Sequence, residues 1–436
     1  MGRKIYVFAG WENDTPIGTL FSDRIRGEEI FSFTYDRQWL NRHPSLELDP
    51  DLLSASGRIY SRDKRLFGTF TDACPDRWGR AMLKRNELLC AGAEGRNART
   101  LTETDFLLGV ADIGRQGGYR FSDTEKLKEP VDTSPVIPPI TDLRKLEQAS
   151  FEYEKGMEKD DETLRILLQP GSSLGGARPK ANVIDTDGTM WIAKFPSKND
   201  EYDVGAWEKT MLDLAEDIGL SVPETKLIRL SDKGSVFLSK RFDRSYDGNG
   251  TVKRIHFASA MTMLMERDGG GNDVGYLDIL EKISSLSSYP EADEEELFYR
   301  AAFDIAVSNS DNHLRNYGFL LDENDKWRLS PAYDINPNPG STELKLNIDF
   351  TDNTRSFSTL RTTSIFYDLS NGEAKDIIDH VTGMVSSRWK EAAKKNGIGR
   401  NEMRLIAPAF ELAEHHRNEH KLYSARYKEQ DVDLDR

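Results

Sequence analysis

Apolar and polar residues alternate in three runs near the start of the chain, which is the pattern of strands that bury one face. Short polar turns separate the runs, and this spacing predicts a β-meander within residues 1–60. After Phe67 the period changes to that of a helix. Residues 76–89 combine apolar positions with a basic flank, which we interpret as solvated surface. The three predicted strands are 5–9, 17–21 and 30–35.

The stretch 126–140 carries four prolines and follows neither period, so it predicts a linker. A short helix is expected at 163–168 and a longer amphipathic one at 203–218. The β-rich runs around them are 181–184, 190–195, 225–229 and 235–239. The later segments are helix-like, at 258–265, 276–283, 294–307, 374–394 and 401–415.

These patterns predict an α+β fold with a β-rich small lobe and a mainly α-helical large lobe. The chain of 436 residues also exceeds the size at which one hydrophobic core keeps growing, so several packed units are expected. The predicted organisation is an accessory subdomain over 1–125, the linker 126–140, an N lobe over 141–239 and a C lobe over 240–436.

The formal net charge of -15, from 59 basic and 74 acidic residues, disfavours a protein that coats nucleic acid by bulk electrostatics. No apolar run is long enough to cross a bilayer, and Met1–Gly10 lacks the extended apolar core of a signal peptide. Cys74 and Cys90 form no metal-binding pattern and are typical of a reducing compartment. We therefore expect a cytoplasmic protein that uses no membrane and no structural zinc.

Asp311 and Asn316 lie five residues apart just after the helix predicted to end near Val307, which is the spacing of a kinase catalytic loop. In that chemistry the Asp accepts the proton of an attacking hydroxyl group, and the Asn amide oxygen holds magnesium. Residues 318–329 predict a hairpin that returns Asp334 to Asn316, where two hard oxygen ligands would suit magnesium. The alternative is that Asp311 caps a turn and that Asp334 precedes an ordinary loop.

The glycine-rich run 171–176 precedes a strand, as does the lid over kinase phosphates, whereas a Walker A loop opens a helix. A plain Gly-Ser turn is the alternative. Lys180 follows this run and either reaches phosphates or lies exposed at a strand edge. Lys194 stands in an otherwise apolar strand and needs an anion, either ATP or Glu208 on the following helix. His313 has no second His or Cys nearby, so we interpret it as orienting the loop.

With these residues assembled, the chain resembles the HipA family of Ser/Thr kinases, the toxin halves of type II toxin-antitoxin pairs. The likeness covers nearly the full length, and it implies a two-lobed, protein-kinase-like fold preceded by an accessory region. The motifs that carry it occur in the family's order: the phosphate loop Ser173–Lys180, the ATP-lysine strand Trp191–Pro196, the hinge Lys240–Asp243, the catalytic loop Asp311–Phe319 and the metal-binding segment Ala332–Pro337.

The resemblance implies a role for each matching residue. Asp311 would be the catalytic base, with Asn316 and Asp334 as the catalytic magnesium ligands. Ser173, or Ser172 beside it, would be autophosphorylated, which switches the kinase off because a phosphoserine adds like charge where ATP phosphates crowd. The hinge departs from the family type, since Lys240 stands in place of a Glu. The expected ATP-binding residues are Ser173, Gly175, Gly176, Ala177, Lys180, Lys194, Arg241, Phe242, His313, Asn316 and Asp334.

The resemblance also implies ATP and Mg²⁺ as cofactors and a HipB-like DNA-binding antitoxin as partner, through which alone the chain would contact DNA. Its protein substrate would be a translation factor, with glutamate-tRNA ligase the best guess among the aminoacyl-tRNA synthetases. Two other functions stay open: a small-molecule phosphotransferase on the same fold, and a catalytically silent partner of a repressor.

Overall fold

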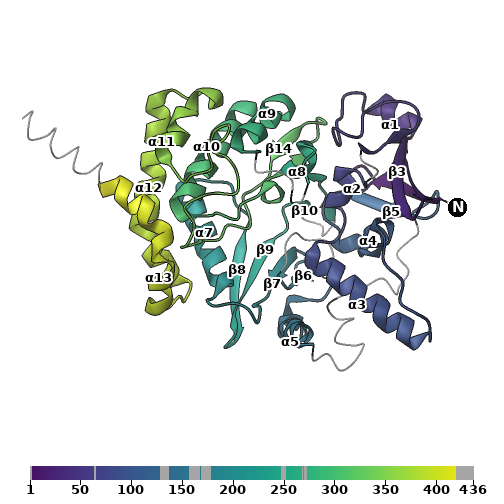
Figure 1. Cartoon of the computed structure of the whole chain (residues 1–436), viewed down its shortest axis with the longest axis horizontal. Coiled ribbons are helices and arrows are strands. Elements are labelled where there is room, and N and C mark those ends of the chain that lie inside the picture. The colour runs from purple at the N-terminus through teal and green to yellow at the C-terminus, as the bar shows by residue number, and fades with distance from the viewer. Residues whose placement is uncertain are drawn as a thin grey trace, which may run out of the picture. The chain divides into compact units, whose positions relative to one another are not determined.

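A computed structural model of the chain describes residues 2–62, 65–127, 137–156, 167, 178–246, 252–267, 269 and 273–418 (Figure 1). It divides into two compact units that do not follow chain order. The first unit comprises Met1–Glu201, Pro223–Asp268 and Tyr317–Ser330, and the second comprises Tyr202–Val222, Gly269–Asn316 and Pro331–Arg436. Each unit combines segments from different parts of the chain, so the two units do not correspond one to one to the expected subdomain and lobes. The expected boundaries near residues 125, 140 and 239 stay predictions.

The predicted meander is confirmed. Strands β1 (Arg3–Ala9), β2 (Thr15–Ile25) and β3 (Glu28–Tyr35) pair antiparallel in succession. Two strands that the sequence did not predict extend the sheet to the order β4-β3-β2-β1-β5, namely β4 (Ile59–Tyr60) and β5 (Tyr119–Ser122). The helices of this region are α1 (Arg37–Arg42), α2 (Gly68–Asp72), α3 (Arg77–Ala93) and α4 (Glu103–Gly109).

A second antiparallel sheet of the first unit has the order β6-β7-β9-β8. It consists of β6 (Lys180–Ile184), β7 (Met190–Lys194), β8 (Thr225–Ser231) and β9 (Gly234–Lys240), as the sequence predicted. Helix α5 (Leu143–Glu154) packs on it. The apolar core beneath this sheet also contains Trp78 and Met82 of α3, so α3 shares a core with the second sheet.

The helix expected over 258–265 is wrong at its start. Residues Phe257–Ser259 form strand β12, which pairs with β13 (Gly318–Leu321), and only Ala260–Met263 is helical, as α8. The pairing needs a glycine, because a Cβ at Gly318 would lie 2.2 Å from the ring of Phe257. Strand β14 (Trp327–Leu329) completes this sheet, and β10 (Arg244–Tyr246) pairs with β11 (Val252–Arg254).

The second unit is mainly helical, as predicted. Trp389 on its longest helix lies flat against Phe410, with ring centres 4.4 Å apart, and the two are buried. The C-terminal helix expected over 401–415 is interrupted by the 3-10 turn Ala407–Phe410, since Pro408 cannot donate a backbone hydrogen bond. The helices are α7 (Val204–Ile218), α9 (Tyr276–Leu286), α10 (Pro290–Val307), α11 (Phe357–Thr362), α12 (Asn371–Lys395) and α13 (Arg400–Ile406).

None of the helices in the described part of the chain combines the length and the apolar character that crossing a bilayer requires. The helix expected at 163–168 lies outside the described residues apart from residue 167.

Candidate functional site

The predicted catalytic loop begins where α10 ends. Ser308 adopts the left-handed backbone conformation, with φ of 58°, and its N–H donates to the carbonyl oxygen of Asp304. The loop then runs to the short 3-10 turn Leu314–Asn316. Asp311 lies in the middle of the loop with its side chain exposed to solvent, and Asn316 is half-buried.

A buried carboxylate in α10 holds this loop in place. Asp304 is only 2% exposed and accepts hydrogen bonds from the Tyr276 hydroxyl at 2.8 Å, the Asn309 amide at 2.7 Å and the Asn312 amide at 2.5 Å. Buried charges persist only with such partners. Because Asn309 and Asn312 flank Asp311 on both sides, Asp304 fixes the backbone that carries it.

The sequence pattern did not predict this supporting set of Tyr276, Asp304, Asn309 and Asn312. A usable signal was nevertheless present, because Asp304 interrupts the apolar run Ala301–Val307, where an ionised group requires donors from elsewhere in the fold. The asparagines that supply them stand just after the helix, inside the predicted loop.

The segment that carries Asp334 is tied to the same loop on both of its sides. Before Asp334, the hydroxyl of Tyr333 donates to the carbonyl oxygen of Arg315 at 2.7 Å. After it, the backbone N–H of Asn336 donates to the Asn309 side-chain oxygen at 3.2 Å. These two links hold Asp334 beside the loop that carries the proposed base.

A third tie lies further along. The Ser308 hydroxyl donates to the carbonyl oxygen of Asn338 at 2.6 Å, and the Asn338 N–H donates back to the carbonyl oxygen of Ser308 at 2.9 Å. The Asn338 side-chain amide also donates to the Ser310 hydroxyl at 2.8 Å. The start of the catalytic loop and the end of the Asp334 segment therefore form one hydrogen-bonded arrangement.

The predicted hairpin that connects the two segments is confirmed. Strands β13 and β14 pair with Phe319 opposite Leu329, and the Ser330 N–H donates to the carbonyl oxygen of Gly318 at 2.8 Å. This last bond closes the open end of the hairpin. The chain positions just before and just after it, including Asn316, are consequently neighbours of one another.

The oxygen groups of this arrangement fit a magnesium ion. Asn316 and Asp334 offer an amide and a carboxylate, and the side-chain oxygen of Asn336 is buried without a hydrogen-bond partner among the described residues. Within the same residues, no group of three or more His, Cys, Asp or Glu side chains could hold a metal. A metal here would depend on phosphate and water for its other ligands, as magnesium commonly does.

Asp334 itself has an uncommon backbone conformation, with φ of 60°. Aspartate and asparagine tolerate this left-handed region better than most residues. The turn of the chain at this residue is thus compatible with a carboxylate ligand.

The two predicted phosphate lysines are partners in the β6–β7 ladder, where Lys180 lies directly opposite Lys194. Opposite residues of an antiparallel pair project from the same face, and like charges in that position repel. The face therefore requires negative charge. Asp76 supplies one negative charge, since its carboxylate lies 3.0 Å from the Lys180 ammonium group. Both side chains are almost fully buried.

Arg241, one of the predicted ATP-binding residues, lies in a buried polar network. Its buried guanidinium group donates to both carboxylate oxygens of Asp243, at 2.8 and 2.6 Å, and to the Asn182 side-chain oxygen at 2.8 Å. It also donates to the backbone oxygens of Gly114 and Arg115. All five of its side-chain N–H groups are thus used within the protein. The predicted part of Arg241 in ATP binding stays a prediction and would fall to its backbone.

Asp243 is the centre of this buried network. Burial alone would raise its pKa, but the charges of Arg241 and Arg244, with hydrogen bonds from Arg241 and the Gly117 N–H, hold it well below its usual range. Burial lowers the pKa of Arg244 to about 9. The network fixes the hinge Lys240–Asp243 to the segment before β5, so any change in the hinge conformation would break buried hydrogen bonds.

The remaining predicted residues are only partly described. Phe242 is half-buried with its ring centre 6.3 Å from that of Phe257, and the Nδ1 atom of His313 is buried without a hydrogen-bond partner among the described residues. Glu208 is buried in α7 of the second unit, and its pairing with Lys194 of the first unit stays a prediction. Ser172, Ser173, Gly175, Gly176 and Ala177 lie outside the described residues.

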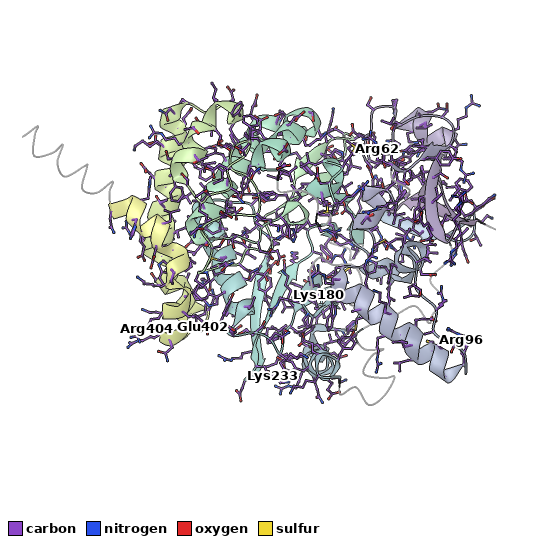
Figure 2. The ribbon with its side chains drawn as sticks, in the orientation of Figure 1. Arg62, Arg96, Lys180, Lys233, Glu402 and Arg404 are labelled. Carbon is purple, nitrogen blue, oxygen red and sulfur yellow. The ribbon has the colours of Figure 1, made fainter. Side chains whose placement is uncertain are left out.

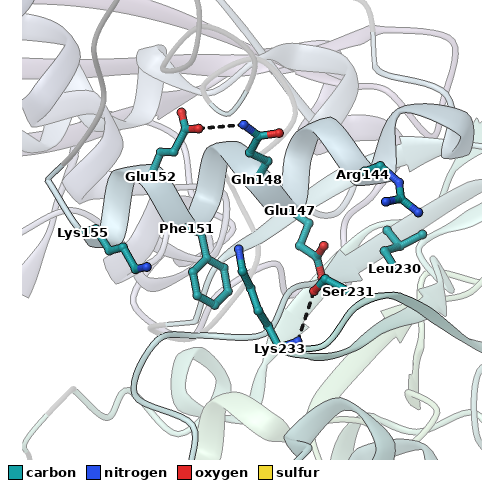
Figure 3. Close-up of a pocket in the computed structure, with 9 residues that line it drawn as sticks. All are labelled: Arg144, Glu147, Gln148, Phe151, Glu152, Lys155, Leu230, Ser231 and Lys233. Carbon is teal, nitrogen blue, oxygen red and sulfur yellow. Dashed lines mark hydrogen bonds between the residues drawn. The ribbon is translucent and has the colours of Figure 1, made fainter.

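A hollow of about 430 Å³ lies in the first unit between α5 and the turn that joins β8 to β9 (Figure 3). The Lys233 ammonium group lies 3.6 Å from the ring centre of Phe151, and the Ser231 hydroxyl donates to Glu147 at 3.0 Å. No residue predicted to bind ATP or metal is among the described residues that line it. It is therefore separate from the candidate catalytic residues.

Comparison with known proteins places these features in a family. Residues 172–389 match the HipA-like C-terminal domain, and residues 10–100 match the HipA N-terminal domain. The "Putative kinase Y4mE" of Sinorhizobium fredii is 25% identical over 429 residues, which cover 91% of this chain and 87% of that protein. A "Putative kinase" of Haemophilus influenzae is 27% identical over 192 residues, covering 40% of this chain and 54% of that one.

A solved structure also matches over nearly the whole chain. It is HipA of Shewanella oneidensis, determined in a complex with HipB and operator DNA, with a TM-score of 0.67. The match covers 94% of this chain and 95% of that chain at 16% sequence identity. An identity this low shows a shared fold, which is the kinase-like α+β fold that the sequence predicted.

Proposed function

This chain belongs to the HipA family, and from that premise we propose that it is an ATP- and Mg²⁺-dependent Ser/Thr protein kinase. The proposal rests on two hydrogen bonds, made by Tyr333 and Asn336, that join the Asp334 segment to the catalytic loop. This loop carries Asp311 and Asn316. A base, an amide ligand and a carboxylate ligand on two fixed neighbouring segments are the parts that phosphoryl transfer requires.

In this mechanism, Asp311 accepts the proton of the attacking serine or threonine hydroxyl group. Asn316 and Asp334 would hold the magnesium ion, which when bound neutralises charge on the ATP phosphates. Lys180 and Lys194, opposite each other on β6 and β7, would contribute positive charge to the same phosphates. Catalysis then consists of positioning and of charge neutralisation.

A protein acceptor is favoured by two features of the second unit. The side chain of Asp311 is exposed rather than enclosed in a small-molecule pocket. The same unit also exposes Phe350, Ile365 and Phe366 by 67%, 75% and 50%, with the two phenyl rings 5.4 Å apart in edge-to-face contact. Clustered apolar surface of this kind is typical of protein-binding sites.

The family suggests the biological setting. The proposal is a cytoplasmic toxin that a HipB-like DNA-binding antitoxin restrains, as HipB accompanies HipA in the Shewanella complex. Its substrate would be an aminoacyl-tRNA synthetase, with glutamate-tRNA ligase the first to test. Autophosphorylation of Ser173 would switch the enzyme off by adding negative charge to the loop that holds ATP phosphates.

Intact-protein and peptide mass spectrometry after incubation with ATP and magnesium tests the proposal. Wild-type protein should gain one phosphate, on Ser173 or Ser172, and Asp311→Ala should lose at least about 100-fold in rate. Asp376→Asn, at an exposed position of α12, is the matched control and should behave as wild type. ATP binding without transfer in wild type would instead indicate a silent partner, and transfer only to small molecules would contradict the protein acceptor.

A further inference from the structure

The ammonium group of Lys180 and the carboxylate of Asp76 form an ion pair of 3.0 Å in which the side chains are 2% and 3% exposed. The two residues come from distant parts of the sequence. Lys180 is the first residue of β6, directly after the predicted phosphate loop, and Asp76 immediately precedes α3 of the N-terminal region. Figure 2 shows Lys180 at the end of α3 that is remote from Arg96.

Asp76 is itself held firmly. It is the N-cap of α3, and its Oδ1 atom accepts a hydrogen bond from the Gly79 N–H at 2.7 Å. The other carboxylate oxygen, Oδ2, faces Lys180. Trp78 and Met82 of the same helix are buried in the core beneath β6 and β7, so the helix that carries Asp76 cannot shift without disturbing that core.

The pairing has a physical reason in the sheet. Lys180 lies opposite Lys194, and two ammonium groups on one face of a ladder destabilise each other. A fixed carboxylate beside Lys180 offsets this repulsion between the two ammonium groups. Protein kinases use a carboxylate in the same way to hold their ATP lysine, although there it comes from the helix that follows the lysine strand.

We propose that Asp76 is a positioning residue for ATP binding, which holds the Lys180 ammonium group in place for the phosphates. The inference rests on the proposed kinase function. It gives the N-terminal region, which includes the matched HipA N-terminal domain, a direct part in building the nucleotide site. The region would thus be required for ATP affinity.

The test compares ATP with adenosine as probes of the full-length chain. Asp76→Asn removes the charge but preserves the helix cap, since asparagine caps as well as aspartate. The affinity for ATP, measured by calorimetry with magnesium, should fall about tenfold, as expected for the loss of one charge-assisted contact. Adenosine, which carries no phosphate, should bind as it does to wild type.

Two further variants sharpen the result. Asp36→Asn alters another aspartate N-cap of the same region, on α1, and should leave ATP affinity unchanged. Lys180→Met should lower ATP affinity by itself, and adding Asp76→Asn to it should cause no further loss. If Asp76→Asn alone does not fold, Asp76→Ser, which also caps the helix without a charge, takes its place in the comparison of ATP with adenosine.

The outcomes separate this inference from the kinase proposal, because binding requires no transfer. Unchanged ATP affinity in Asp76→Asn, or equal losses for ATP and adenosine, would mean that the pair only stabilises the fold and would overturn the inference. A wild-type chain that binds ATP but transfers no phosphate would contradict the kinase proposal alone. A wild-type chain that binds no ATP would overturn both.

Discussion

The Tyr333 hydroxyl donates a hydrogen bond of 2.7 Å to the carbonyl oxygen of Arg315, which joins the residues that immediately precede the two proposed metal ligands. Tyr333 precedes Asp334, and Arg315 precedes Asn316. One side chain thus sets the spacing between two segments that the β13–β14 hairpin separates in sequence.

Replacement of Tyr333 by phenylalanine should loosen this spacing. The ring is retained and one hydrogen bond is lost, which corresponds to about 1 kcal/mol, or roughly fivefold. We expect the magnesium concentration for half-maximal autophosphorylation to rise by about that factor, measured in a magnesium titration. An unchanged magnesium requirement would show that the bond does not position the ligands.

Asp334→Asn should raise the magnesium requirement by at least about tenfold, because a charged ligand becomes a neutral one. Asparagine is the suitable replacement, since it tolerates the φ of 60° that this residue adopts. Asp334→Ala should in addition lower the melting temperature. Equal magnesium requirements for Asp334→Asn and wild type would exclude this carboxylate as a ligand.

Asp304→Asn should weaken the support beneath the catalytic loop. A neutral amide replaces a carboxylate that accepts three side-chain hydrogen bonds, from Tyr276, Asn309 and Asn312, so we expect about 2 kcal/mol less stability. Urea unfolding measures this loss. The autophosphorylation rate should fall while ATP affinity stays constant, and a loss of ATP affinity would argue against a role confined to the loop.

Arg241→Met should destabilise the protein by about 3 kcal/mol, because it leaves Asp243 buried without one of its charge partners. The affinity of the folded protein for ATP should not change, since the guanidinium group is fully used by Asp243, Asn182 and backbone oxygens. Arg229→Met, at an exposed position of β8, is the control for both measurements. A selective loss of ATP affinity in Arg241→Met would show that the Arg241 side chain itself contacts ATP.

His256 should make the protein sensitive to mild acid. The imidazole is buried against Trp11, with ring centres 4.5 Å apart, and burial lowers its pKa to about 3. The folded chain therefore takes up this proton less readily than the unfolded chain, whose histidine pKa is about 6.5. The contribution of His256 to the free energy of unfolding is therefore fully present above about pH 6.5. It decreases as the pH falls, by roughly 2 kcal/mol between pH 6.5 and 5.

His256→Phe keeps an aromatic ring and removes the titrating group. Urea unfolding at pH 7 and at pH 5 should show a smaller loss of stability in this variant than in wild type. Equal losses in the two proteins would assign the acid sensitivity to other groups.

Several features followed from the sequence because they depend on neighbours in the chain. The alternation in 5–35 was sufficient to predict β1, β2 and β3, and the apolar stripe of 203–218 was sufficient to predict α7. The hairpin after Asn316 could also be predicted, since its turn and strands are local. Strand β12 could not be predicted, because it pairs with β13, which is distant in sequence. The pairing also depends on a glycine at position 318, where any side chain would collide with Phe257.

The sequence by itself determined the elements, the order of the family motifs and the identity of the chemical groups, because periodicity and spacing are properties of adjacent residues. Only the tertiary structure decided which of those groups are engaged. In the fold, Asp76 forms an ion pair with Lys180, and Asp243 forms one with Arg241. Asp304 lies beneath the catalytic loop and accepts a hydrogen bond from Asn312. The physical reason is that a charge can be buried only where the fold brings it partners, and those partners come from elements that no local pattern connects.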